Sequence, residues 1–180
     1  LGAAGRGICE HFGVSPAQGD LWMGTISKAL GSAGGYIAGK QILIEYLKYT
    51  TPSFVFATAL SPANAAAALA ALRLLQEEPE RVTRLRDRAQ RFLQLARKCG
   101  LNTGSSQATP VVPVIVGDSV RCVQLSAALL AEGVDVQPIL YPAVPESASR
   151  LRFFITAEHT EAQIRRTVRL LRDQWSKIGP

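Results

Sequence analysis

The 180-residue chain is poor in the residues from which metal centres, disulfide frameworks and membrane spans are built. It has three cysteines (Cys9, Cys99 and Cys122), two histidines and one methionine. The cysteines are odd in number and widely spaced, which fits reduced thiols in a cytoplasmic protein better than a disulfide framework or a zinc site. No run of about eighteen apolar residues occurs, so the sequence predicts no membrane-spanning helix.

The chain also lacks a starting methionine and a signal-type segment at Leu1. We therefore expect a processed or truncated piece of a longer protein. Hydrophobic residues make up 47% of the chain, which is a globular composition. The length allows one domain with a proper core, or one and a half.

The net charge of +6 comes mostly from arginine in two segments, residues 80–98 and 161–177. Both segments have apolar residues at helical spacing, so they predict amphipathic helices with solvated basic faces. Neither interleaved aromatic residues nor a nucleic-acid motif accompanies them, and we expect no nucleic-acid partner. A basic surface could instead attract phosphorylated cofactors, coenzyme A or an acidic carrier protein.

Alternating strand and helix patterns predict an α/β protein. The segment 52–60 is expected to be extended, and Ser61 and Pro62 are expected to open a helix. We interpret residues 1–76 as part of one α/β unit and residues 77–180 as a smaller α/β domain. The predicted strands are 20–26, 34–39, 109–117, 134–140 and 150–156, and the predicted helices are 40–50, 61–79, 80–98, 119–133 and 161–175.

Two lysines lie in glycine-rich surroundings, and the second resembles part of a phosphate-binding loop. Gly34, Gly39 and Lys40 match most of GxxxxGK, but Gln41 stands where a Ser or Thr should hold magnesium. The residues inside this candidate loop also read as a strand. Lys40 is therefore predicted to be an ordinary exposed lysine at the start of a helix.

Lys28 has more suggestive neighbours. Thr25 and Ser27 precede it at the end of a predicted strand, and mainly small residues follow it. Hydroxyls and free backbone amides can bind a phosphate dianion, while a desolvated lysine amine can form a Schiff base with an aldehyde cofactor. The spacing alone fits equally well with a surface lysine in a glycine-rich loop.

Sequence blocks spread along the chain favour the first interpretation. The segments "GAAGRGICEHFG", "GTISKALGSAGGYIAG", "FVFATALSPANAAAA" and "LYPAVPESASRLRFFITAEHT" occur in this order. Together they resemble the α-oxoamine synthases, which are pyridoxal-phosphate (PLP) enzymes of fold type I with the aminotransferase class I/II fold. The resemblance covers nearly the whole chain. It implies the C-terminal part of such an enzyme, with the remnant of the large mixed-sheet domain followed by the small C-terminal α/β domain.

The resemblance also implies roles for particular residues. Lys28 would form the Schiff base with PLP and then act as the base that removes the α-proton of the amino acid. Thr25 and Ser27 would bind the cofactor phosphate, and Thr58 would reach the phosphate of a neighbouring subunit's cofactor in a homodimer. Arg152 would pair bidentately with the substrate carboxylate.

Two nearby residues are expected to stay outside the site. We expect Arg150 to face the opposite side from Arg152, and His159 to organise the turn after the arginine-bearing strand. No metal is implied. The Asp that pairs with the pyridine nitrogen and the His that stacks on the ring would both lie upstream of Leu1, so we expect the 180 residues alone to bind PLP poorly.

The implied reaction condenses an amino acid with an acyl thioester, carried by coenzyme A or acyl carrier protein, usually with loss of carbon dioxide. Another fold-type I PLP enzyme, an aminotransferase or a lyase, would share Lys28 and is the alternative. A non-catalytic partner subunit would be expected to lack this lysine. A plain binding module would owe its activity to the arginine-rich helices.

Overall fold

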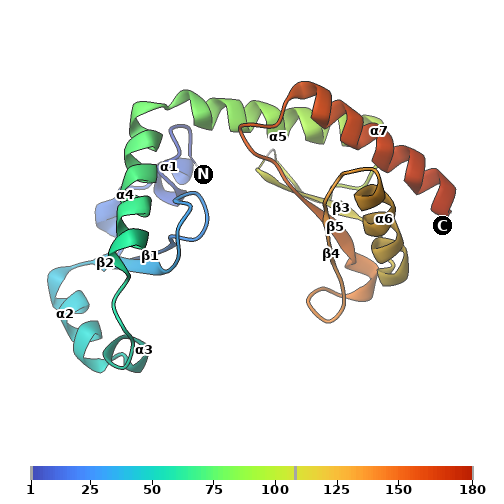
Figure 1. Cartoon of the computed structure of the whole chain (residues 1–180). Helices are drawn as coiled ribbons and strands as arrows, with labels where there is room; N and C mark the ends of the chain where they lie inside the picture. Colours follow the sequence, from blue (N-terminus) through green and yellow to red (C-terminus); the bar gives the residue numbers. More distant parts are fainter. Residues whose placement is uncertain (1, 108, 180) are drawn as a thin grey trace. The chain divides into compact units, whose positions relative to one another are not determined.

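A computed structural model describes residues 2–107 and 109–179 of the chain (Figure 1). Its internal contacts divide the chain into two compact units, Leu1–Glu80 and Arg81–Pro180. The second unit has a hydrophobic core, whereas residues 2–80 of the first unit form none.

The first unit contains a β-hairpin, and three helices of different lengths follow the hairpin. The predicted strands, the helix after them and the long alanine-rich helix are confirmed. Ser61 caps the last of these, since its side chain accepts a hydrogen bond from the Asn64 amide, and Pro62 is its first residue. The elements are α1 (Ile8–Phe12), a 3-10 turn (Pro16–Gln18), β1 (Leu21–Thr25), β2 (Gly35–Gly39), α2 (Gln41–Thr50), α3 (Pro52–Val55) and α4 (Pro62–Glu77).

The extended conformation expected for residues 52–60 is wrong in its first part. Pro52–Val55 forms the short helix α3, in which the amides of Val55 and Phe56 bond to the carbonyls of Thr51 and Pro52, both at 3.0 Å. Proline favours the first position of a helix because its fixed φ is already helical and its missing N–H would have no partner there. The apolar composition of residues 52–60 predicted an extended segment, and the preference of Pro52 for the start of a helix was missed.

The hairpin of β1 and β2 exposes apolar side chains on both faces. The strands pair antiparallel from Leu21 opposite Gly39 to Thr25 opposite Gly35. Met23 on one face is 76% exposed and Tyr36 on the other is 50% exposed, and Ile26 is the one buried hydrophobic side chain among residues 2–80. Strands that are apolar on both faces are typical of sheets covered on both sides. This unit therefore presents surfaces that suit burial inside a larger fold.

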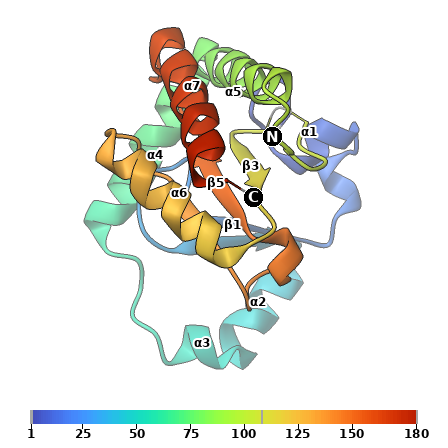
Figure 2. The same ribbon diagram turned by 90° about the vertical axis from the view of Figure 1, so that its right-hand side faces the viewer.

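The second unit is a three-stranded antiparallel sheet covered on one face by helices (Figures 1 and 2). The strand order is β3–β5–β4, with Pro113 and Gln137 on either side of Arg152. All strands and helices predicted for this half are confirmed. They are α5 (Glu80–Lys98), β3 (Val111–Ile115), α6 (Ser119–Ala131), β4 (Gln137–Ile139), a 3-10 turn (Glu146–Ala148), β5 (Arg150–Phe154) and α7 (Glu161–Ile178).

Alternate residues of the sheet and one stripe of each helix form the core of this unit. Leu151 of β5 is fully buried, and the rings of Phe92 and Phe153 lie 4.8 Å apart. Gly100 has φ 75° and ends α5 as predicted. Thr160 and Gln163 form a reciprocal capping box at the start of α7.

A carboxylate holds the start of α6 against the turn before β5. Glu146 accepts hydrogen bonds from the Ser119 amide at 2.6 Å and from the Ser119 hydroxyl at 2.5 Å, and the same hydroxyl lies 2.9 Å from that of Ser149. The hydrogen bond from the Ser119 side chain, followed by that from its amide, lowers the pKa of the Glu146 carboxyl below 4.5.

We predict that Leu129→Ala lowers the free energy of unfolding by about 2–5 kcal/mol, because it opens a cavity in the core. Leu130→Ala is the matched control, since Leu130 is 59% exposed whereas Leu129 is 0% exposed. The control should change stability by no more than about 0.5 kcal/mol. Urea unfolding followed by circular dichroism measures both variants, and equal losses would contradict the assignment of the core.

We further predict that Glu146 stabilises the fold in a pH-dependent way. Its pKa is lowered in the folded state, so its contribution is present above the ordinary value of 4.5 and is lost as pH falls through the lower folded value. Wild type should therefore exceed Glu146→Gln in stability near neutral pH, and the two should converge in acid. Denaturant midpoints measured across this range test the prediction, and a constant difference between the curves would refute it.

Candidate functional site

The loop between β1 and β2, which carries Lys28, is closed by hydrogen bonds of its own backbone. The Ile26 amide donates to the Gly34 carbonyl at 2.9 Å, and the Gly31 amide donates to the Lys28 carbonyl at 3.0 Å. Gly31 has φ 59°, which a glycine adopts without steric cost. These bonds make the loop a tight turn with Lys28 as one of its exposed residues.

The loop is also tied to α4. The Ser32 hydroxyl donates to the Asn64 carbonyl at 2.8 Å. Gly34 has φ 107°, and a Cβ built there would lie 3.2 Å from the Leu60 side chain. The last part of the loop is therefore held between the hairpin and the residues that lead into α4.

Lys28 lies beside the two predicted hydroxyl residues. Buried Ile26 separates Thr25 from Ser27, and both of these flanking residues are exposed, as the alternation along an extended segment requires. Within the described residues, Lys28 has no hydrogen bond or ion pair, so its amine is available. The structure thus places one free amine and two hydroxyls in a single four-residue stretch.

Lys40 is in a different situation. Its Nζ lies 3.0 Å from the Asp20 Oδ1, and both side chains are largely exposed. It is the residue before α2, and Gly35–Gly39 before it form strand β2. A strand where a phosphate loop would need a turn confirms that this segment is not a phosphate-binding loop.

Thr58 lies after α3, on the rim of a separate hollow of about 460 Å³ in the first unit. Tyr49, Phe54 and Val55 contribute the apolar part of its lining, and Lys48 contributes one charge. Among residues 2–80, no hydrogen bond joins Thr58 to the Lys28 loop.

Arg152 and Arg150 lie in the second unit on the same face of β5. Leu151 between them points into the core, so the expectation that Arg150 faces the opposite side is wrong. Residues two apart on a strand share a face because side chains alternate with period two. The Arg152 guanidinium lies 4.9 Å from the centre of the Phe154 ring and is exposed, whereas Arg150 is half-buried.

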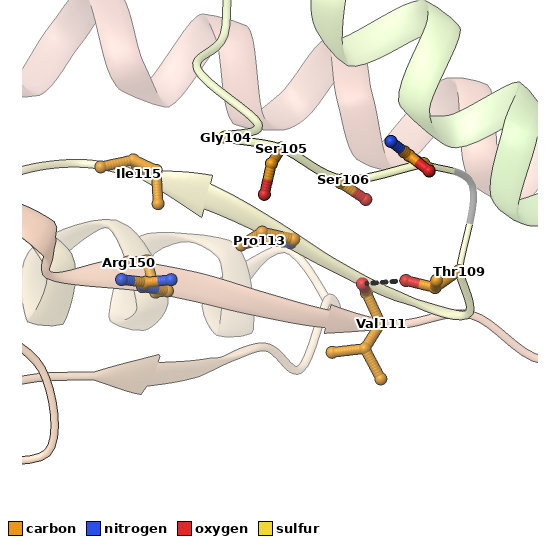
Figure 3. Close-up of a pocket in the computed structure, with 9 residues that line it drawn as sticks. Gly104, Ser105, Ser106, Thr109, Val111, Pro113, Ile115 and Arg150 are labelled. Carbon is orange, nitrogen blue, oxygen red and sulfur yellow. Dashed lines mark hydrogen bonds between the residues drawn. The ribbon is translucent and has the colours of Figure 1, made fainter. Parts of the chain in front are cut away.

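Beside Arg150, the loop before β3 and the outer residues of that strand enclose a hollow of about 420 Å³ (Figure 3). The sequence reading did not identify this site. Its signal is the hydroxyl-rich stretch "GSSQAT", residues 104–109, which comes after a helix and before a strand. The lining residues are Gly104, Ser105, Ser106, Gln107, Thr109, Val111, Pro113, Ile115 and Arg150.

The remaining polar candidates have structural surroundings. His159 accepts the Thr156 amide on Nδ1 at 3.0 Å, which confirms that it organises the turn after β5. Burial raises the pKa of the Cys122 thiol to about 11, so it is a poor nucleophile. Within the described parts of the chain, no group of three or more His, Cys, Asp or Glu side chains could hold a metal ion.

Comparison with known proteins agrees with this arrangement. The sequence model of the aminotransferase class I and II family matches residues 2–171, and the chain belongs to this family. Among the helices that the structure describes, none is both long and apolar enough to cross a membrane.

Curated proteins named 8-amino-7-oxononanoate synthase are similar to this chain over most of its length. The chain is 47% identical to 8-amino-7-oxononanoate synthase of Thermosipho melanesiensis over 91% of its length and 41% of the relative. It is 44% identical to the Fervidobacterium nodosum enzyme of the same name, over 99% of the chain and 44% of the relative. The chain therefore spans less than half the length of these curated relatives.

A solved structure has the same fold. Serine palmitoyltransferase from S. paucimobilis with bound PLP–myriocin aldimine superposes with a TM-score of 0.91 at 27% identity. The match covers 99% of this chain and 45% of that one. The predicted fold class is confirmed, because the chain has the α/β fold of the corresponding portion of fold-type I PLP-dependent enzymes.

Proposed function

We propose that this chain supplies the cofactor lysine and the substrate arginine of a PLP-dependent acyltransferase. The enzyme would condense an amino acid with an acyl thioester of coenzyme A or acyl carrier protein, usually with loss of carbon dioxide, to give an α-amino ketone. The observation that carries the proposal is the free amine of Lys28 beside the hydroxyls of Thr25 and Ser27 in a braced loop. The similarity to 8-amino-7-oxononanoate synthases supports the reaction class.

The residues around Lys28 fit a phosphorylated aldehyde. Thr25 and Ser27 offer hydroxyl donors for a phosphate, and no Asp or Glu occurs between Leu21 and Ile44 to repel it. Glycine, alanine and serine predominate after Lys28, so little side-chain bulk obstructs a planar ring. Lys28 would bind the aldehyde carbon, and Thr25 and Ser27 would hold the phosphate.

When bound, PLP supplies the electron sink that stabilises negative charge at the amino acid's α-carbon. The Lys28 amine, once released from the aldehyde, would accept the proton from this carbon, because the loop holds it next to the bound cofactor. Loop bracing through Ser32 and Gly31 would keep that amine in position.

Arg152 would bind the carboxylate of the amino acid. Its guanidinium is exposed and has no hydrogen-bond or ion-pair partner among residues 2–107 and 109–179. The guanidinium lies 4.9 Å from the centre of the Phe154 ring, and its planar fork can bind a carboxylate bidentately.

The proposal also assigns the two parts of the chain to domains and places the chain in a homodimer. Residues 1–76 would be the C-terminal part of the PLP-binding domain, and residues 77–180 the small domain. Thr58 would contact the phosphate in the partner of a cytoplasmic homodimer, and its exposed position is compatible with this role. The acidic partner of the pyridine nitrogen and the ring-stacking His would come from outside these 180 residues.

An aminotransferase or lyase activity is the second candidate, because the matching family is described as aminotransferase class I and II. Such an enzyme would use Lys28 in the same way but would not consume an acyl thioester. Thiol release from acyl donors in the presence of glycine, serine or alanine separates the two activities.

We predict that Lys28→Ala abolishes the visible absorption band that PLP acquires when it is joined to a lysine. The test uses a protein that carries this chain together with the upstream segment present in its relatives. Lys40→Ala is the matched control and should keep the band, because Lys40 pairs with Asp20. Persistence of the band in Lys28→Ala, or its loss only in Lys40→Ala, would disprove the role of Lys28.

We also predict that Arg152→Gln weakens amino-acid binding about tenfold or more while PLP binding survives, because a charge-assisted bidentate contact is lost. Arg169→Gln, which removes an exposed arginine of α7, is the control and should leave the affinity unchanged. The spectral change of bound PLP on titration with amino acid measures both. Equal affinities in wild type and Arg152→Gln would remove Arg152 from the site.

A further inference from the structure

The hollow on the open face of the second unit's sheet has the polar lining of an anion site. It measures about 420 Å³, within the range of pockets that hold small ligands. Hydroxyl and amide side chains of the 104–109 loop line one side, and Arg150 of β5 lines another (Figure 3). No Asp or Glu is among its lining residues.

The loop is held in place from behind by Arg97 of α5. Its Nη2 donates to the Ser106 carbonyl at 2.7 Å, and its Nε donates to the Thr103 hydroxyl at 3.1 Å. The Gly104 amide donates to the Asn102 side chain at 3.0 Å. Residues 104–106 are therefore preorganised, and a ligand that binds them does not have to order them.

Two groups in the hollow have unused hydrogen-bonding capacity. The Ser106 hydroxyl is buried and has no partner among the described residues, which is costly unless a ligand or water satisfies it. Arg150 is half-buried, and its Nε donates to the Ala148 carbonyl at 2.8 Å. This bond fixes the guanidinium and leaves both terminal nitrogens for a ligand.

We propose that this hollow is a phosphate-binding subsite in which Arg150 and the hydroxyls of Ser105 and Ser106 hold the anion. A guanidinium fork binds phosphate bidentately, and the hydroxyls of Ser105 and Ser106 can donate to the remaining oxygens. The Thr109 hydroxyl is not among these donors, because it already donates to the Val111 carbonyl at 3.0 Å. A carboxylate has only two oxygens and would leave several of these donors without a partner. Donors on several sides therefore favour the tetrahedral group.

The identity of the phosphate carrier rests on the proposed function. Acyl thioesters of coenzyme A and of acyl carrier protein both contain the phosphate of phosphopantetheine. Coenzyme A also carries phosphate on its nucleotide. The subsite would hold this phosphate while the thioester carbon meets the amino acid elsewhere. Arg150 is thus a binding residue for the acyl donor and takes no part in proton transfer.

The test is titration of the full chain with inorganic phosphate, followed by amide chemical shifts and calorimetry, without PLP. Phosphate should shift the amides of Gly104, Ser105 and Ser106, and Arg150→Gln should weaken binding about tenfold or more. Ser106→Ala should weaken it by a smaller factor. Arg169→Gln removes the same charge from exposed α7 and should leave the affinity within about twofold of wild type.

Two further ligands identify which phosphate of the acyl donor binds in the hollow. Tighter binding of adenosine 3′,5′-bisphosphate than of pantetheine 4′-phosphate indicates the nucleotide of coenzyme A, and the reverse order indicates the phosphopantetheine that both acyl donors share. Equal affinities of wild type and Arg150→Gln overturn the proposal, as does binding of acetate as tight as that of phosphate. Equal weakening by Arg169→Gln also overturns it, because binding would then reflect net charge alone.

The outcome is independent of Lys28. Lys28→Ala should bind phosphate in the hollow as wild type does, because Lys28 is not among the residues that line it. If Lys28→Ala loses the PLP band and still binds phosphate, both the role of Lys28 and the phosphate subsite are supported. If the PLP band persists in Lys28→Ala, only the proposed function is refuted. Arg150→Lys keeps the charge but lacks the fork, and intermediate affinity in this folded variant confirms bidentate binding.

Discussion

Alternation along β5 decides what each face of the second unit can do. Leu151 and Phe153 pack into the core against helices, and this burial turns Arg150, Arg152 and Phe154 to the open face. Because β5 is the central strand, with β3 on one side and β4 on the other, its register cannot slip without moving core residues into solvent. The hydrophobic contact behind the sheet thus fixes the arginines in front of it.

The first unit follows a different rule, because local hydrogen bonds rather than a core define its chemistry. Backbone bonds close the Lys28 loop, and Ser32 ties it to α4. The apolar side chains of its hairpin and helices remain exposed, with Ile26 the single buried one among residues 2–80. These local bonds give the Lys28 loop its shape although residues 2–80 have no hydrophobic core.

Helix ends and strand patterns were predictable because they depend on neighbours in the sequence. Ser61, Pro62 and Gly100 mark helix boundaries through their own capping and backbone preferences, and the structure confirms each. The short helix α3 escaped prediction because an apolar run does not distinguish a strand from a helical turn. Arg150 was misplaced although strand periodicity alone puts it beside Arg152.

The sequence by itself determined the α/β order of elements, the Lys28 loop with its two hydroxyls, and the arginine-bearing strand. These features depend on residues within a few positions of one another. Only the tertiary structure joined the 104–109 loop to Arg150, because that neighbourhood arises from the antiparallel pairing of β3 with β5. A single sequence does not specify which strands pair, or how a helix such as α5 braces a loop through Arg97. The Lys28 loop could therefore be predicted from neighbouring residues in the sequence, whereas the hollow beside Arg150 could not.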